Sequence, residues 1–441
     1  MTVCLRLCAM VLSSHLGILK NLCNFAVVKI AIVHYRFFPG DGPERYLFNI
    51  IDLLERNGHT VAPFSVANSR NEDSYYSKFF LKDIGDEVHF GDSGRSLMKT
   101  AKALPRMFWS TEARRKFGRF LDEFQPDIVY VLQYHNKISP SFIPEAKKRG
   151  IPVVHRISDF QYMCPNAIFF SHGRICEACL EGHSFRCIKQ RCVRGSLAMS
   201  VVKLAAKKYH DAIGIKRKID AFVVPSGFTL SRLLRYGIDE KKLVHIPTFY
   251  NVRIGKAASE LTYEPFFLFI GRITEQKGVR TLVEAFADTD MPLKIIGTSA
   301  DNLEAELKAS LEGRRHKIEF LGFQPFEKIA PWLERCRATI VPSIWYDNFP
   351  NTILESFGFA KPVIASSTGS LLETVIDGET GLTFSPGNAG ELRKAARRLL
   401  ANEQEARTLG ANAQKMVETR FSEQAHYDKL MRLFADLIAK K

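Results

Sequence analysis

The sequence predicts an α/β protein built from two doubly wound domains, and three observations lead to this expectation. The chain has 441 residues, which is more than one hydrophobic core usually serves. Short apolar runs alternate with helical segments, the pattern of a parallel sheet with crossover helices. The series starts afresh after residue 264, so we expect two such sheets, one in each domain, facing one another.

The first series of apolar runs describes the N-terminal domain. It predicts strands at residues 29–34, 59–64, 127–132, 152–155 and 221–225. Helices are predicted at 44–57 and 139–148, each followed by a glycine (Gly58 and Gly150) that can cap a helix C-terminus. We expect this domain to cover residues 28–248, with an insertion rich in cysteine at 164–192.

The second series describes the C-terminal domain, expected at residues 249–420 after a linker near 247–264. Its predicted strands lie at 266–270, 293–296, 318–320, 338–341, 362–365 and 382–384. A last helix, about 423–439 in the terminal segment 421–441, is expected to cross back onto the first domain.

Residues 1–27 differ from the rest of the chain. They are apolar, are interrupted by Arg6, His15 and Lys20, and lack a clear small-residue cleavage site for a signal peptide. No stretch of 18 residues there is free of charge, which argues against a membrane span. We expect a misassigned start, with Val28 as the true first codon, and a non-native extension before it.

The net charge of +15 is concentrated in one half of the chain. Residues 1–250 carry 37 Lys and Arg against 22 Asp and Glu, whereas residues 251–441 carry 25 of each. A solvated surface, an anionic membrane leaflet or a phosphate-bearing substrate would each explain the surplus. No nucleic-acid reading module accompanies it, so nucleic acid is not the expected partner.

Two motifs of the second half carry chemistry. After the strand 266–270 come Gly271, Arg272 and, five residues on, Lys277 and Gly278. A glycine at a strand end lets a ligand approach the backbone, and two cations at this spacing can clamp a diphosphate. Taken alone, the motif would also suit two solvated cations.

The second motif lies in residues 340–384. Seven residues separate Asp347 from Glu355, two helical turns, so both carboxylates can face one cleft if the helix starts early enough. Asn351 and Thr352 open that helix and would offer backbone N–H groups to a phosphate. Gly369, Glu373, Gly378 and Gly381 follow in turn-rich loops.

Together the two motifs resemble the nucleotide-sugar half of retaining GT-B glycosyltransferases of family 4. The first matches that family's G-R-x4-K-G pattern at every fixed position. The second departs at Asp347, where the family has Glu, and at Ser370, where it has a second Gly. The resemblance covers about residue 29 to the C-terminus and implies the GT-B fold, with two Rossmann-like domains facing a cleft.

The resemblance also implies roles for these residues. Gly271, Arg272 and Lys277 would bind the donor's pyrophosphate, so that no metal is needed for catalysis. Asn351 and Thr352 would bind a phosphate and Glu355 the ribose hydroxyls, whereas Asp347 would contact the donor sugar. In the first domain Gly42, separated from Gly40 by Asp41, would face the diphosphate.

A further catalytic candidate follows the strand near residue 152. Family members often have a His-Asp pair there; this chain has Ser158 and Asp159, so only the carboxylate is kept. By resemblance, Asp159 belongs to the acceptor side of the cleft.

Five cysteines cluster between two predicted strands of the first domain. Cys176 and Cys179 form a CxxC pair, and Cys187 and Cys192 follow, with the ligand types of a four-thiolate zinc site. An iron–sulfur cluster or free buried thiols are the alternatives, and disulfides are not expected in a cytosolic protein. Cys164 is the fifth member.

The resemblance implies a retaining transfer of a hexose-type sugar from a UDP- or GDP-linked donor to a lipid-linked or polysaccharide acceptor. The expected location is cytoplasmic, peripheral at the inner face of a membrane. Two other functions stay open: a non-transferase enzyme of the same fold, such as a nucleotide-sugar epimerase, and a non-catalytic binding protein.

Overall fold

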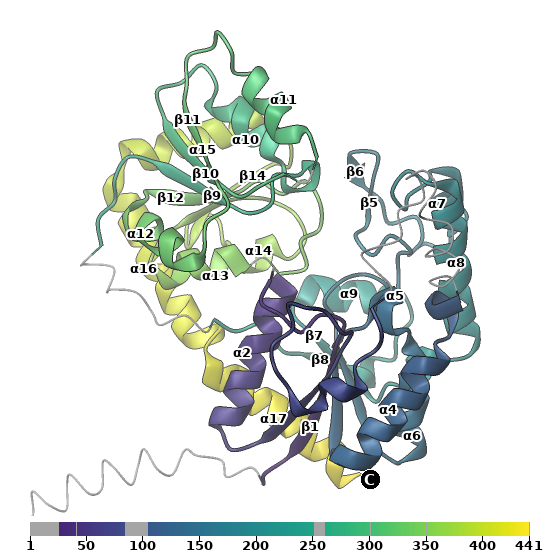
Figure 1. Ribbon diagram of the computed structural model, residues 1–441. Coiled ribbons are helices and arrows are strands. Elements are labelled where there is room, and N and C mark those ends of the chain that lie inside the picture. The colour runs from purple at the N-terminus through teal and green to yellow at the C-terminus, as the bar shows by residue number, and fades with distance from the viewer. Residues whose placement is uncertain are drawn as a thin grey trace, which may run out of the picture.

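The computed structural model describes residues 26–40, 42–83, 105–250, 261–299, 301–349 and 351–440 (Figure 1). Two α/β domains lie one above the other in this view, and the chain ends beside the first of them. The expected extension falls almost wholly outside the described residues, as does the middle of the expected linker, 251–260.

The N-terminal domain has a six-stranded sheet in which every pair is parallel, in the order β2-β1-β3-β4-β7-β8. Helices lie along the chain between these strands. The strands are β1 (Lys29–His34), β2 (Thr60–Phe64), β3 (Ile128–Gln133), β4 (Val153–Arg156), β7 (Ala221–Val224) and β8 (Leu243–His245). The helices are α2 (Gly42–Arg56), α4 (Thr111–Phe124), α5 (His135–Ile138), α6 (Ile143–Lys148), α8 (Leu197–Ala212) and α9 (Gly227–Arg235).

Local sequence explains why these helices form where they do. In α2 the buried Tyr46, Leu47, Ile50 and Leu54 recur at helical spacing and pack on the sheet. Helix α4 starts at Ser110, whose hydroxyl accepts the Ala113 N–H at 3.0 Å. The sequence did not predict β8, nor the short β5 (Phe170–Ser171), β6 (Arg174–Ile175) and α7 (Arg186–Lys189) of the cysteine-rich insertion.

The C-terminal domain has a second parallel sheet, in the order β11-β10-β9-β12-β13-β14. Its strands are β9 (Phe267–Ile270), β10 (Pro292–Ile296), β11 (Lys317–Gly322), β12 (Ala338–Val341), β13 (Val363–Ser366) and β14 (Gly381–Phe384). Its helices are α10 (Val279–Phe286), α11 (Leu303–Ala309), α12 (Phe326–Arg335), α13 (Asn351–Gly358), α14 (Leu371–Thr374), α15 (Ala389–Ala401) and α16 (Glu403–Arg420). The strand order reverses between β9 and β12, and in such sheets ligands bind beyond the carboxyl ends of the strands at that point.

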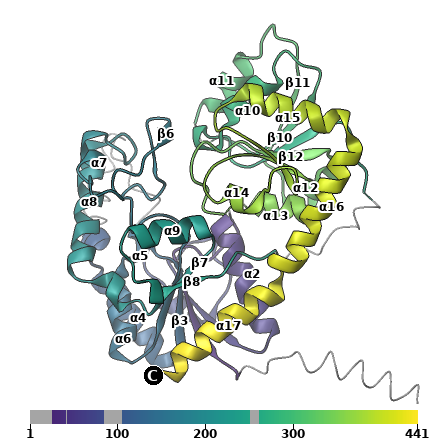
Figure 2. The same cartoon turned by 180° about the vertical axis from the view of Figure 1, so that it is seen from behind.

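The last helix, α17 (Glu423–Ala439), continues from α16 and lies along the first domain (Figure 2). Its buried Tyr427, Leu430 and Phe434 join the core formed by β1 and α2. The His59 ring is hydrogen-bonded to the Tyr427 hydroxyl at 2.8 Å. The expectation of two doubly wound domains in the GT-B arrangement is therefore confirmed.

Candidate active site

The loop after β9 is held against the loop after β12 by a glycine. Gly278 has a φ of 70°, and a Cβ built on it would lie 1.8 Å from the carbonyl oxygen of Pro342. Only glycine permits that approach. The Ile344 N–H also donates to the Gln276 carbonyl at 2.9 Å. The short turn Glu275–Lys277 is thus fixed at the switch point of the sheet.

This contact places Lys277 beside Asp347. The Lys277 Nζ lies 2.8 and 2.9 Å from the two carboxylate oxygens of Asp347. The Ser343 hydroxyl donates to the same carboxylate at 2.6 Å. Asp347 is 6% exposed, so the acidic partner of this ion pair is buried. The two residues predicted for the phosphate and the sugar are therefore bound to each other.

Arg272 differs from Lys277 in having no partner. It follows Gly271 at the end of β9, it is exposed, and it makes no hydrogen bond or ion pair with any residue that the structure describes. An exposed guanidinium beside a buried cation–carboxylate pair leaves this edge of the sheet ready for an anion.

Helix α13 begins at the same edge. The Thr352 hydroxyl donates to the Ile270 carbonyl at 3.3 Å, which ties the helix N-terminus to the end of β9. The Asn351 side chain lies 3.5 Å from the carbonyl oxygen of Gly42 in the other domain. The helix starts only at Asn351, so Asp347 lies in the loop before it, and the two carboxylates do not stack on one helix face.

Glu355 is buried and forms an ion pair with Arg45 of α2, across the two domains. Burial raises the pKa of the Glu355 carboxyl, and the Arg45 guanidinium opposes this shift. The sequence did not indicate Arg45, because the pair joins residues 310 positions apart.

The loop that carries Asp347 also docks on the first domain. The Tyr346 ring lies 4.5 Å from the Phe228 ring, between centroids. The Asn348 side-chain N–H donates to the Ile157 carbonyl at 2.9 Å. Glu373 accepts the backbone N–H of Gly227 at 2.8 Å, at the N-terminus of α9. None of these contacts was predicted from the sequence, although Glu373 was named there as part of the turn-rich loops.

Asp159 lies after β4, on the first domain's side of this interface. It accepts the Gln161 backbone N–H at 2.8 Å and lies 3.4 Å from the Gln133 side-chain nitrogen. Ser158, in the family's histidine position, donates to the Leu132 carbonyl at 3.1 Å. Ser158 thus holds the loop after β4 in place, and Asp159 is the acidic side chain of that loop.

The five clustered cysteines line one small cavity in the insertion, and all are free thiols. A hydrogen bond from the Cys187 thiol lowers the pKa of the Cys192 thiol. In the described part of the chain, no set of three or more His, Cys, Asp or Glu side chains is arranged to hold a metal ion. The four-thiolate zinc site of Cys176, Cys179, Cys187 and Cys192 stays a prediction.

Comparison with solved structures supports the fold. Sucrose-phosphate synthase from Thermosynechococcus elongatus superposes with a TM-score of 0.66 at 20% identity, over 94% of this chain and 100% of that one. Two doubly wound domains that face one another define the GT-B class of glycosyltransferase fold. In this chain the loops after β9 and β12 meet at the edge of the second sheet.

Comparison of sequences identifies the second domain. Residues 255–416 match the family described as Glycosyl transferases group 1, and the match includes the site residues from Gly271 to Glu355. An uncharacterized glycosyltransferase of Methanocaldococcus jannaschii is 35% identical over 34% of this chain and 42% of the relative. The D-rhamnosyltransferase WbpZ of Pseudomonas aeruginosa is 32% identical over 36% and 42%.

The match to the group 1 glycosyltransferases thus lies in the second domain, at residues 255–416. The aligned segments span less than half the length of these curated relatives.

Proposed function

We propose that this chain is a retaining glycosyltransferase. It transfers a hexose-type sugar from a UDP- or GDP-linked donor to a hydroxyl of a lipid-linked or polysaccharide acceptor. One observation carries the proposal: the unpaired Arg272, Lys277 and the N-terminus of α13 converge where the strand order of the second sheet reverses. Two cations and helix N–H groups at such an edge suit a diphosphate.

The donor's charge determines how the site changes when it is filled. A nucleotide diphosphate brings negative charge to Arg272, which has no carboxylate partner among the described residues. Lys277 lies between that place and Asp347, so it can bind the pyrophosphate while keeping its carboxylate bond. Asp347 then faces the sugar beside Lys277. Glu355 accepts the ribose hydroxyls in place of Arg45.

The mechanism that follows needs no protein nucleophile. The bond between the sugar's anomeric carbon and the phosphate oxygen breaks, and the leaving diphosphate is stabilised by Arg272 and Lys277. The acceptor hydroxyl attacks from the same face, so the configuration is retained. Its proton passes to a phosphate oxygen of the leaving group. Asp159, at the mouth of the first domain, orients the acceptor.

We also propose that the protein works at the inner face of a membrane. None of the helices in the described chain is both long and apolar enough to cross a bilayer. Helix α8 instead exposes Leu197, Val201 and Tyr209 (50%, 43% and 38%) beside the exposed Lys208, and Phe185 next to α7 is 77% exposed. Exposed apolar groups interspersed with cations favour adsorption to anionic lipid.

The first experiment is a thermal-shift screen of UDP-, GDP- and ADP-sugars on the full chain, because a bound donor stabilises by mass action. Arg272→Ala should abolish the shift. Arg280→Ala is the matched control, since Arg280 is engaged with Glu275 at 2.6 Å and Glu306 at 2.5 Å. Donor binding left intact by Arg272→Ala would refute the clamp.

Product analysis separates this function from its rivals. A transferase forms a new glycoside only when an acceptor is present. Conversion of the nucleotide sugar without any acceptor would identify an epimerase. Binding without turnover across a panel of acceptors would identify a non-catalytic protein.

A further inference from the structure

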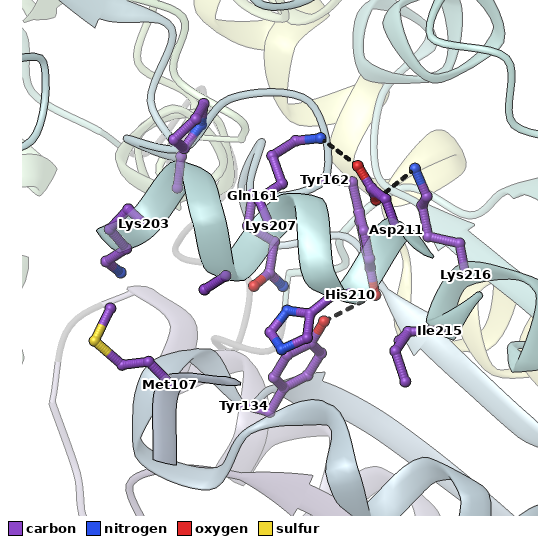
Figure 3. A pocket seen from close by; sticks show the side chains of 13 residues that line it. Met107, Tyr134, Gln161, Tyr162, Lys203, Lys207, His210, Asp211, Ile215 and Lys216 are labelled. Atoms are coloured by element: carbon purple, nitrogen blue, oxygen red, sulfur yellow. Dashed lines mark hydrogen bonds and ion pairs between the residues drawn. The ribbon is translucent and has the colours of Figure 1, made fainter. Parts of the chain in front are cut away.

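A cavity lies in the first domain, outside the donor site (Figure 3). It encloses about 690 Å³ of empty space, open solvent included, between α8, the turn Ile215–Lys218, and the ends of β3 and β4. Met107, Pro165, Ala167, Ala206 and Ile215 form its apolar walls.

The polar lining of the cavity is mainly cationic. Lys203, Lys207 and His210 come from α8, and Lys216 from the following turn. Asp211 is the sole carboxylate among the described lining residues, and it binds both Lys207 and Lys216 at 2.9 Å. His210 is hydrogen-bonded to the Phe108 carbonyl at 2.8 Å. The lysines therefore exceed the acids by two.

Lys203 lies outside the network of Lys207, Asp211 and Lys216. It is partly buried and makes no hydrogen bond or ion pair with any residue the structure describes. In Figure 3 its side chain lies toward Met107, apart from the Lys207–Asp211–Lys216 group. Burial lowers the pKa of Lys203 to about 8, with Asp159 acting in the opposite sense. An ammonium group kept away from both water and a counter-ion is costly, and an anion in the cavity would remove that cost.

The cavity also offers uncharged hydrogen-bonding groups. The hydroxyls of Tyr134 and Tyr162 lie 3.3 Å apart on its wall, and Tyr162 is in turn bonded to His155 Nδ1 at 2.5 Å. The Gln161 side chain lines the same space. Hydroxyl and amide groups beside an ammonium are the groups that bind a sugar or glycerol carrying a phosphate.

One loop joins this cavity to the domain interface. Residues 157–167 supply Gln161, Tyr162, Pro165 and Ala167 to the cavity. The same loop begins at Ile157, whose carbonyl accepts the Asn348 side chain of the donor domain at 2.9 Å. The Gln161 N–H is held by Asp159 at 2.8 Å. A ligand in the cavity therefore shares its wall with the residues that face the donor.

We propose that this cavity binds the phosphate group of the acceptor, with Lys203 as its principal counter-ion. The acceptor role rests on the proposed function, whereas the anion site itself does not. The acceptor is then a phosphorylated sugar or glycerol, free or attached to a lipid, whose hydroxyl is presented past Asp159 to the donor.

The test measures binding of inorganic phosphate and glycerol 1-phosphate to the full chain by calorimetry. Lys203→Met should weaken both roughly tenfold or more, since it removes a charge-assisted hydrogen bond. Lys241→Met, at an exposed lysine of the first domain that does not line the cavity, should change neither affinity. Lys203→Met should unfold at no lower temperature than the wild type without phosphate, because it removes an unpaired charge.

Arg272→Ala separates this site from the donor clamp. Phosphate binding that survives Arg272→Ala and is lost in Lys203→Met supports the cavity site, even if no nucleotide sugar binds. Phosphate binding that is lost in Arg272→Ala and kept in Lys203→Met overturns it. Vesicles of phosphatidylcholine with phosphatidic acid distinguish the sources: weaker vesicle binding by Lys203→Met than by Lys241→Met assigns a lipid headgroup, and an effect in solution alone assigns a soluble phosphate.

Discussion

Replacing Lys277 with methionine tests the contact on which the donor site depends. The Lys277 side chain is 20% exposed and that of Asp347 8%, so their ion pair is neither a surface pair nor a fully buried one. Surface pairs contribute about 0–1 kcal/mol, and removing one partner of a buried pair costs about 3–5 kcal/mol. Because Ser343 still donates to the stranded carboxylate, we expect Lys277→Met to lower the free energy of unfolding by about 2 kcal/mol.

The matched change is Asp347→Asn, which keeps the shape of the side chain and removes its charge. It leaves Lys277 with partial access to solvent, so we expect a smaller loss, about 1 kcal/mol. The double variant should lose less than the sum of the two, with a coupling energy of roughly 1–2 kcal/mol. Urea unfolding followed through tryptophan fluorescence reports on this region, because the Trp345 ring lies 5.7 Å from the Lys277 nitrogen.

Donor binding distinguishes a functional pair from a structural one. In the double variant, stability should recover toward that of Asp347→Asn, while the thermal shift caused by the nucleotide sugar stays absent. A double variant that binds donor like the wild type would refute the assignment of Lys277 to the diphosphate. A coupling energy near zero would refute the pair itself.

Three further predictions concern other parts of the molecule. Glu373→Gln removes a carboxylate that caps α9 from the other domain, so it should loosen the domain arrangement by about 1 kcal/mol and increase the radius of gyration in small-angle scattering; an unchanged radius would contradict this. Burial lowers the pKa of His426 to about 3, so the folded chain binds fewer protons than the unfolded chain between there and about 6.5. The free energy of unfolding should keep this contribution above pH 6.5 and fall by about 1.4 kcal/mol per pH unit below it. In urea unfolding at several pH values, His426→Gln should flatten that slope. If the four thiols Cys176, Cys179, Cys187 and Cys192 bind zinc, the purified protein should contain about one zinc per chain and lose it in Cys176→Ser/Cys179→Ser; zinc-free protein of full stability would count against the site.

Much of the fold was accessible from local patterns. Buried parallel strands are continuous apolar runs, so β1, β9 and β12 could be placed within a residue of their bounds. The short β8 and the β5–β6 hairpin could not, because a strand of two or three residues carries no periodicity of its own. The start of α13 at Asn351 agrees with the sequence, and it leaves Asp347 in the loop before the helix.

The residues of the candidate site also fall into those that the sequence indicated and those that it did not. Arg272, Lys277 and Glu355 were singled out because two short motifs resemble those of a glycosyltransferase family, and such motifs are local features. Arg45, Tyr346 and Asn348 were not, because each acts across the domain interface. The cavity around Lys203 was visible in the sequence only as a surplus of positive charge in the first half.

The sequence alone determined that two parallel sheets form and which loops carry the residues proposed to bind phosphate, because strand periodicity and glycine placement are properties of neighbouring residues. Only the tertiary structure decided what those residues meet. It paired Lys277 with Asp347, brought Arg45 to Glu355 and left Lys203 without an ion pair among the described residues. Such pairings depend on the register of two sheets and the contact between two domains, which no spacing along one chain specifies.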